Sequence, residues 1–127
     1  MIRGPVALAT CREALGLDTD MPLVQAALQR AGIDNLVVPW DDDQDWSRFS
    51  LVVIRSTWDY HRRYDEFMMW VRNVSQVTRL ANGADVIVWN TDKRYLADLT
   101  AAGMPIVPTT YVAPGESLEP AAVRSAR

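Results

Sequence analysis

The sequence predicts an α/β fold in which one open parallel sheet is covered by helices on both faces. Short apolar runs alternate with amphipathic segments along the 127 residues, a length that suits one domain. The run Leu51–Ile54 is apolar on both sides, which is typical of strands buried between two helical layers. Because alternating strands and helices connect by right-handed crossovers, neighbouring strands are expected to be parallel.

The first half of the chain predicts three strands and one helix. The helix is expected to begin after Asp20, which can act as its N-cap, and Pro22 fits its first turn. Gly32 is expected to end it. The positions that recur at helical spacing are Leu23, Ala26, Ala27 and Arg30. The strands are expected at residues 5–10, 36–40 and 51–54.

The second half predicts a strongly amphipathic helix and a short fourth strand. Asp65 and Glu66 are favourably placed in the first turn of this helix. A short strand at Leu80–Ala81 follows, closed by Asn82 and Gly83. The apolar stripe of the helix contains Phe67, Trp70, Val71, Val74 and Val77.

The segment after Gly83 is harder to interpret. "ADVIVWN", residues 84–90, is favoured as a strand by its β-branched residues. Asn90 or Thr91 is then expected to cap a last helix that ends at Gly103. Met104–Val112 is expected to form a final strand, and residues 113–127, which have no apolar periodicity, a disordered or frayed tail.

Composition narrows the classes of partner and compartment. Hydrophobic residues make up 49% of the chain and charged residues 23%, as in ordinary globular domains. The net charge of −3 argues against nucleic acid or an anionic membrane as the main partner. The single cysteine, Cys11, excludes an internal disulfide, and no stretch approaches the roughly 18 apolar residues of a membrane helix. We therefore expect a cytoplasmic location.

Two loops follow the carboxyl ends of predicted strands, where open α/β sheets bind ligands. Thr10, Cys11 and Arg12 lie in the first loop, and the second, residues 55–61, concentrates a guanidinium, two hydroxyls, a carboxylate, aromatic rings and the only histidine. This mixture suits a small amino-acid-like or carboxylate substrate. The candidate substrate-binding residues are Thr10, Cys11, Arg55, Ser56, Thr57, Trp58, Asp59 and Tyr60. Alternatively, Trp58 and Tyr60 cover the end of the sheet and Asp59 caps the next helix.

Other reactive residues favour structural interpretations, and we predict no metal site. His61 has no second ligand at metal-binding spacing and fits a solvated histidine at a helix entry. The acidic loop 41–45 lacks the glycine and terminal glutamate of a calcium loop, so we interpret it as solvated. Cys11 is either an exposed nucleophile or a buried small residue. Neither a G-x-G-x-x-G motif nor a P-loop occurs.

Three stretches carry a resemblance to a known family. "TDKRYLADLTAAGMPIVPTTYV", residues 91–112, looks like the entry to an ATP-grasp ligase domain, with an Asp-Lys pair opening a helix and two prolines before a strand. "STWDYHRRYDEF" and "VVPWDDDQDW" strengthen the likeness. Over residues 5–112 the chain resembles the N-terminal region of bacterial glutathione-synthetase-like ATP-grasp proteins, in particular the cycloserine-forming cyclo-ligase subgroup.

The resemblance implies a division of the chain and a role for one lysine. Residues 1–88 would form a Rossmann-like pre-ATP-grasp domain that helps to bind the substrate, and residues 89–112 the first helix and strand of the ATP-grasp region. "ADVIVWN" would then be helical, against its propensity. Lys93 would reach toward the nucleotide phosphates. The alternative is that Asp92 caps the helix and Lys93 is solvated.

The family continues into two lobes that supply a strand lysine, an adenine slot and magnesium ligands, none of which fits in residues 113–127. We therefore expect the substrate-binding part of an ATP-dependent carboxylate–amine ligase, truncated before those lobes and inactive alone. ATP and Mg²⁺ are expected for full-length relatives and no cofactor for this chain. Alternatively, the chain is a stand-alone small-molecule-binding or dimerisation module without catalysis. In the second case it would form a homodimer. A receiver-like domain is disfavoured because Arg55 stands where an aspartate would be needed.

Overall fold

The computed structural model describes residues 4–113 and 115–117. The chain forms two compact units, one ending at Ile87 and the other beginning at Val88. None of the helices in the described ranges is long and apolar enough to cross a membrane.

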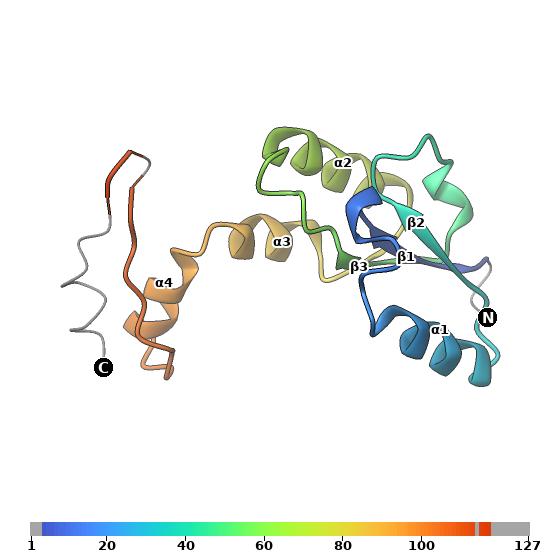
Figure 1. The fold of residues 1–127 in the computed structure, drawn as a ribbon, viewed down its shortest axis with the longest axis horizontal. Helices are drawn as coiled ribbons and strands as arrows, with labels where there is room; N and C mark the ends of the chain where they lie inside the picture. The colour runs from blue at the N-terminus through green and yellow to red at the C-terminus, as the bar shows by residue number, and fades with distance from the viewer. Residues whose placement is uncertain (1–3, 114, 118–127) are drawn as a thin grey trace. The chain divides into compact units, whose positions relative to one another are not determined.

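The first unit contains a four-stranded sheet in the order β2-β1-β3-β4 (Figure 1). All three pairings are parallel, which confirms the predicted α/β fold with an open parallel sheet. β1 and β3 are the central strands, so their carboxyl ends lie side by side. The strands are β1 (Val6–Thr10), β2 (Asn35–Pro39), β3 (Leu51–Ser56) and β4 (Leu80–Ala81).

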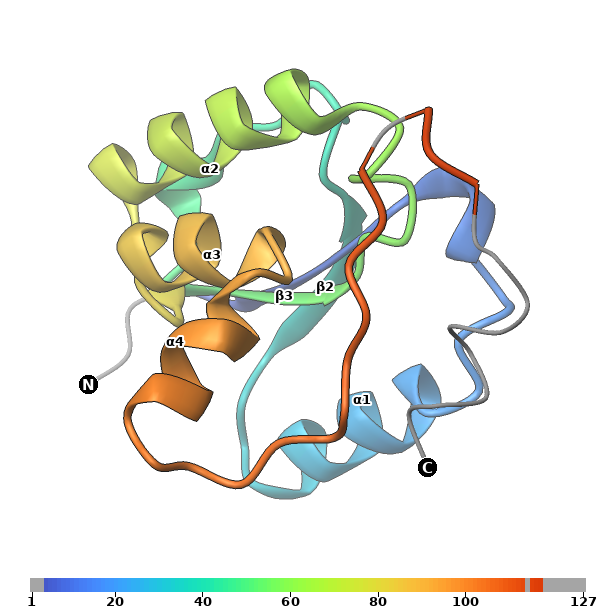
Figure 2. The same ribbon diagram turned by 90° about the vertical axis from the view of Figure 1, so that its left-hand side faces the viewer.

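The helix α1 (Met21–Arg30) covers one face of the sheet (Figures 1 and 2). Pro22 lies in its first turn as predicted, but Asp20 makes no side-chain capping hydrogen bond. Leu23, one of the positions that recur at helical spacing, is 67% exposed. Met21 and Val24 instead pack against the strands. The apolar positions of a short helix fit two faces, and only the approach of the sheet selects one.

The opposite face is covered by α2 (Tyr64–Val77) and holds the larger, aromatic core (Figure 2). Four of the five predicted stripe residues are buried, and Val77 is not, at 53% exposed. Met68 is buried instead, at 3% exposed. Two short 3₁₀ helices, η1 (Arg12–Ala14) and η2 (Trp46–Arg48), follow β1 and β2 on the chain. The buried aromatic rings are Trp40, Trp46, Phe49, Phe67 and Trp70.

The segment "ADVIVWN" is helical, so the strand favoured by propensity is wrong. It forms most of α3 (Ala84–Thr91), as the family resemblance implied. Ile87 is 7% exposed and belongs to the core on the α2 side of the sheet. Burial of the Ile87 side chain in this core outweighs the β-propensity of the neighbouring valines.

The second unit contains α4 (Tyr95–Ala101), which begins later than predicted. Neither Asn90 nor Thr91 caps it. Instead, an Asp92 carboxylate oxygen accepts a hydrogen bond from the Arg94 backbone N–H at 3.0 Å. Gly103 follows the helix with a φ of 78°, a left-handed conformation that favours glycine, as predicted.

The strand predicted at Met104–Val112 is wrong, since this segment joins no sheet among the described residues. Pro105 and Pro108 each lack a backbone N–H, and no described strand lies in register beside them. Most of the tail expected to be frayed, residues 113–127, lies outside the described residues.

Candidate functional site

The two predicted loops meet at the point in the sheet where the strand order reverses. β1 connects outward to β2 on one side and lies beside β3 on the other, so the crevice between β1 and β3 is the topological switch point. The Cys11 backbone N–H donates a hydrogen bond to the Ser56 carbonyl oxygen at 3.1 Å. The structure therefore brings the loops after β1 and β3 together, although they lie more than forty residues apart in the chain.

Thr10 and Ser56 form a buried hydroxyl pair at this crevice. Their oxygens are 2.8 Å apart, and each residue is 1% exposed. The parallel register between β1 and β3 shifts at Thr10, which places it opposite Ser56. Each hydroxyl gives the other a partner within the fold, so the pair joins the two central strands and does not face solvent.

Cys11 and Arg55 are also engaged within the fold. Cys11 is 1% exposed and packs in the core on the α2 side, which favours the interpretation as a buried small residue. Arg55 lies 3.5 Å from a carboxylate oxygen of Asp18 and 4.0 Å from one of Asp20. The guanidinium predicted to bind a carboxylate ligand is thus paired with carboxylates of this chain.

The loop after β3 carries a buried carboxylate. Asp59 is 7% exposed, and its Oδ1 accepts a hydrogen bond from Trp40 Nε1 at 3.0 Å. Asp59 therefore does not cap α2; it holds the loop after β3 against the end of β2. Thr57 is buried, whereas Trp58 is 50% exposed. Tyr60 is half-buried and packs on Phe67, with ring centroids 5.8 Å apart.

A hollow of about 310 Å³ opens at this edge of the sheet. Three guanidinium and three carboxylate groups surround it, and they come from the loops after β1, β2 and β3. Arg12 and Arg62 are its most exposed cations, with side chains 64% and 56% exposed. The lining residues are Arg12, Glu13, Asp41, Asp59, Arg62 and Arg63.

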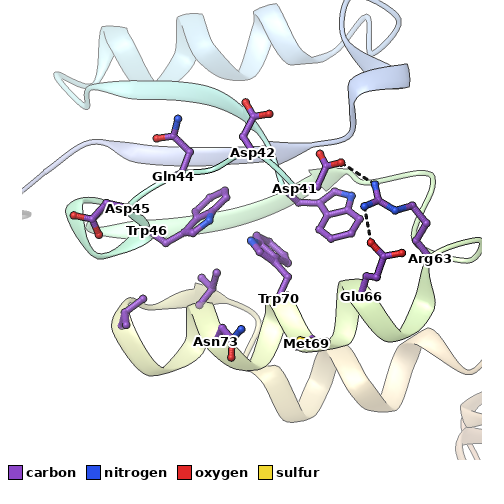
Figure 3. Close-up of a pocket in the computed structure, with 13 residues that line it drawn as sticks. Asp41, Asp42, Gln44, Asp45, Trp46, Arg63, Glu66, Met69, Trp70 and Asn73 are labelled. Carbon is purple, nitrogen blue, oxygen red and sulfur yellow. Dashed lines mark hydrogen bonds and ion pairs between the residues drawn. The ribbon is translucent and has the colours of Figure 1, made fainter.

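Arg63 is the centre of this charged group (Figure 3). Its Nη1 donates to Asp41 at 2.8 Å and lies 3.5 Å from Asp59, while its Nη2 donates to Glu66 at 2.7 Å. The guanidinium also covers the Trp40 ring at 4.5 Å from the ring centroid. Hydrogen bonds to Glu66 and then Asp41 raise the pKa of Arg63, and the bond from Arg63 lowers the pKa of Glu66.

Comparison with known proteins places this geometry in a family. The family model described as "D-cycloserine synthetase DcsG, N-terminal domain" matches residues 6–82. The cycloserine biosynthesis protein DcsG of Streptomyces lavendulae is 47% identical over 113 residues, which cover 88% of this chain and 38% of that protein. The crystal structure of D-cycloserine synthetase DcsG matches with a TM-score of 0.81 at 46% identity, covering 89% of this chain and 38% of that chain.

The chain belongs to the DcsG N-terminal domain family. It spans 38% of the length of the relative and of the solved structure that it matches. The matched range 6–82 contains the whole hollow and the crevice between β1 and β3. The similarity to a ligase therefore covers the candidate site, and the resemblance identified from the sequence is confirmed.

Lys93 lies outside the range matched by the DcsG N-terminal model. Its ammonium is exposed and donates to the Asn90 carbonyl oxygen at 2.8 Å. The Lys93 carbonyl oxygen in turn accepts a hydrogen bond from the Tyr111 hydroxyl at 3.3 Å. These contacts are local to the second unit, and a role toward nucleotide stays a prediction.

Sequence reasoning missed most of the residues that line the hollow. Two carboxylates of the acidic loop that was predicted to be solvated form ion pairs: Arg12 pairs with Asp41, at 3.7 Å, and with Asp42. Arg62 pairs with Glu13 across the same hollow. One signal in the sequence could have identified them. Charged residues follow each of three predicted parallel strands, and the carboxyl ends of parallel strands lie at one edge of the sheet.

Within the described ranges, no group of three or more His, Cys, Asp or Glu residues is placed to hold a metal ion. The carboxylates near the hollow are instead neutralised by arginines. His61 is exposed and packs edge-on against the Tyr60 ring, with centroids 6.0 Å apart.

Proposed function

We propose that this chain is the substrate-binding part of an ATP-grasp carboxylate–amine ligase of the cycloserine-synthetase kind. On this proposal the hollow at the carboxyl ends of β1, β2 and β3 binds a small amino-acid-like substrate. The observation that carries the proposal is the charged hollow itself, which lies at the switch point of the sheet and inside the matched range. The proposal places the protein in the cytoplasm, which a chain with one buried cysteine supports.

The charges of the hollow complement a zwitterion. A guanidinium can hold a carboxylate with two parallel hydrogen bonds, and a carboxylate can accept from an ammonium group. Arg12 and Arg62 are exposed enough to reach a ligand, and Glu13, at 64% side-chain exposure, lies beside them. An exposed ion pair contributes only about 0–1 kcal/mol, so a substrate can replace the existing pairs at little cost.

ATP and Mg²⁺ enter the proposal only through the longer relatives. Lys93 is the one described residue assigned toward nucleotide, and its ammonium already donates to a backbone carbonyl. In the described part of the chain, no group of three or more His, Cys, Asp or Glu residues is placed to hold a metal ion.

We expect the 127-residue chain by itself not to turn over ATP. Phosphate release from ATP and Mg²⁺, measured with the purified chain, is expected to stay at the background of a mock purification. Steady phosphate release above that background would contradict this expectation but would leave the substrate-binding proposal unaffected.

Thermal-shift titration tests the substrate-binding proposal directly. D-cycloserine and D-serine serve as zwitterionic probes, and propionate and ethylamine as singly charged ones. A ligand at 100 times its Kd stabilises the folded state by about 2.7 kcal/mol. We expect the zwitterions to stabilise the chain more than either singly charged probe.

A pair of arginine variants locates the binding. Arg62→Gln removes a cation of the hollow and is expected to weaken zwitterion binding. Arg72→Gln is the matched control, because Arg72 lies on the exposed side of α2 away from the hollow. The absence of any zwitterion-dependent shift, or equal losses in both variants, would refute the assignment.

Dimerisation is a second candidate function, favoured by the second unit. None of its described residues is buried, and Trp89, Met104 and Val107 are 45%, 56% and 80% exposed. Where exposed apolar side chains form a contiguous patch, they mark an interaction surface. Sedimentation equilibrium is expected to show a dimer that Val107→Ser weakens, and a monomer at all concentrations would exclude this function.

A further inference from the structure

A second, larger hollow lies between α2 and the loop that follows β2 (Figure 3). We call it the acidic groove. Its volume is about 690 Å³, within the roughly 300–1,000 Å³ typical of small-molecule sites. It shares Asp41 and Arg63 with the smaller hollow at the carboxyl ends of β1, β2 and β3, which we call the rim hollow, but is otherwise built from different residues.

The groove has an excess of negative charge. Four carboxylates line it, from Asp41, Asp42, Asp45 and Glu66, against the single guanidinium of Arg63. That guanidinium is already paired with Asp41 and Glu66. Even with Arg12 counted as the partner of Asp42, carboxylates outnumber cations around this groove.

Asp45 is the carboxylate whose charge has no cation within ion-pair distance among the described residues. Its Oδ1 accepts from the Ser47 backbone N–H at 3.0 Å and from the Ser47 hydroxyl at 2.5 Å. These hydrogen bonds lower the pKa of Asp45, so the group is ionised at neutral pH. Ser47 is uncharged and supplies its hydrogen bonds, and the charge of Arg48 acts on Asp45 without forming an ion pair.

The remaining lining is mostly apolar and also includes the amide side chains of Gln44 and Asn73. Trp46 and Trp70 meet edge to face, with ring centroids 5.3 Å apart, and each is 9% exposed. Figure 3 shows Trp70 rising from α2 toward Trp46, and its Nε1 is buried without a hydrogen-bond acceptor. Met69 and Val77, which are 58% and 53% exposed, extend this surface along the helix.

The charges decide which kind of occupant fits. A second copy of this chain docking groove to groove would place one carboxylate-rich surface against another, which is repulsive. An anion is disfavoured for the same reason. A cation with an apolar body gains both Coulomb attraction and contact with the tryptophan, methionine and valine side chains.

We propose that the acidic groove binds a small organic cation, namely an ammonium or guanidinium group attached to an apolar chain. The charged end lies near Asp45 and the apolar part lies along Trp46 and Met69. The proposed contacts with Asp45, Trp46 and Met69 use no residue of the rim hollow, so the site does not depend on the proposed ligase function.

Isothermal titration of the intact chain tests this with three probes of one length: hexylammonium, hexanol and hexanoate. We expect hexylammonium to bind with a stoichiometry of one and to bind more weakly as salt is added, because salt screens exposed charges. Hexanol is expected to bind more weakly and hexanoate not at all. Equal binding of the three probes, or none by hexylammonium, would overturn the proposal.

Variants then locate the cation. Asp45→Asn removes the charge but keeps a side chain that caps helices equally well, so folding is preserved. It is expected to weaken hexylammonium binding about two- to fivefold, the range of an exposed ion pair. Asp65→Asn is the matched control, since Asp65 is exposed on α2 outside the groove. Equal affinities for the two variants would refute the role of Asp45.

A separate measurement asks whether a second copy occupies the groove. Met69→Gln makes its exposed apolar rim polar, and the proposal expects it to weaken hexylammonium binding while leaving the sedimentation behaviour unchanged. A dimer that Met69→Gln dissociates would show that another copy covers the groove, and the cation-binding proposal would then be wrong.

Discussion

The hydrogen bond from Trp40 to Asp59 should contribute measurably to stability, because both partners are buried. Trp40 is 3% exposed and Asp59 is 7% exposed, and the Nε1–Oδ1 distance is 3.0 Å. Asp59→Ala would leave the indole N–H buried without an acceptor, which costs about 1–3 kcal/mol. Loss of the contact between Asp59 and Arg63 should add little to the destabilisation, because Arg63 keeps its hydrogen bonds to Asp41 and Glu66.

The expected destabilisation by Asp59→Ala is therefore about 1–3 kcal/mol in the free energy of unfolding. Asp59→Asn retains an acceptor and nearly the same volume, so its cost should be smaller. Gln76→Ala, at an exposed position of α2, is the surface control and should change stability by less than about 0.5 kcal/mol. Urea unfolding followed by far-UV circular dichroism, with an unchanged m-value, gives these differences.

A double-mutant cycle separates the hydrogen bond from other effects. Trp40→Phe removes the donor and keeps an aromatic ring. Combined with Asp59→Ala, it should show a coupling of about 0.5–3 kcal/mol, as residues in direct contact do. Additive effects, or an Asp59→Ala variant as stable as the Gln76→Ala control, would refute the reasoning.

Three other predictions concern packing, the backbone and pH. Val71 is fully buried, so Val71→Ala should cost about 2–3 kcal/mol in urea unfolding, whereas the same change at Val77, 53% exposed, should cost little. Gly4 has a φ of 105°, and a Cβ there would collide with a backbone carbonyl, so Gly4→Ala should lower the thermal midpoint strongly. Hydrogen bonds from Arg94 lower the pKa of Asp92 to about 2, and a carboxyl NMR titration should show it return toward 3.8 in Arg94→Gln. Any stabilisation from this pair is present above pH 3.8 and is lost as the pH falls toward 2; an unchanged Asp92 pKa in the variant would contradict the assignment.

Local chemistry alone determined much of the first unit. Apolar runs of strand length predicted β1, β2, β3 and β4, because a parallel sheet buried on both faces needs apolar side chains on both sides of each strand. Pro22 and Gly103 were correctly placed, since a fixed φ and a positive φ are local requirements.

The choice between helix and strand after β4 needed the tertiary structure. Val86, Ile87 and Val88 favour a strand by propensity, yet the segment is helical because Ile87 fits the core on the α2 side. Met104–Val112 shows the reverse case: strand-like residues form no strand in the described part of the chain, because a strand requires a neighbour.

The candidate site was likewise only half determined by sequence. Its position at the ends of β1 and β3 followed from the alternation of elements, and those loops do meet. The sequence did not indicate which side chains face the hollow. Thr10 and Ser56 turn out to satisfy each other, while Arg12 and Arg63 reach Asp41 across the sheet edge. Local spacing sets which face of a strand a residue occupies, but strand order and loop path decide which charges become neighbours.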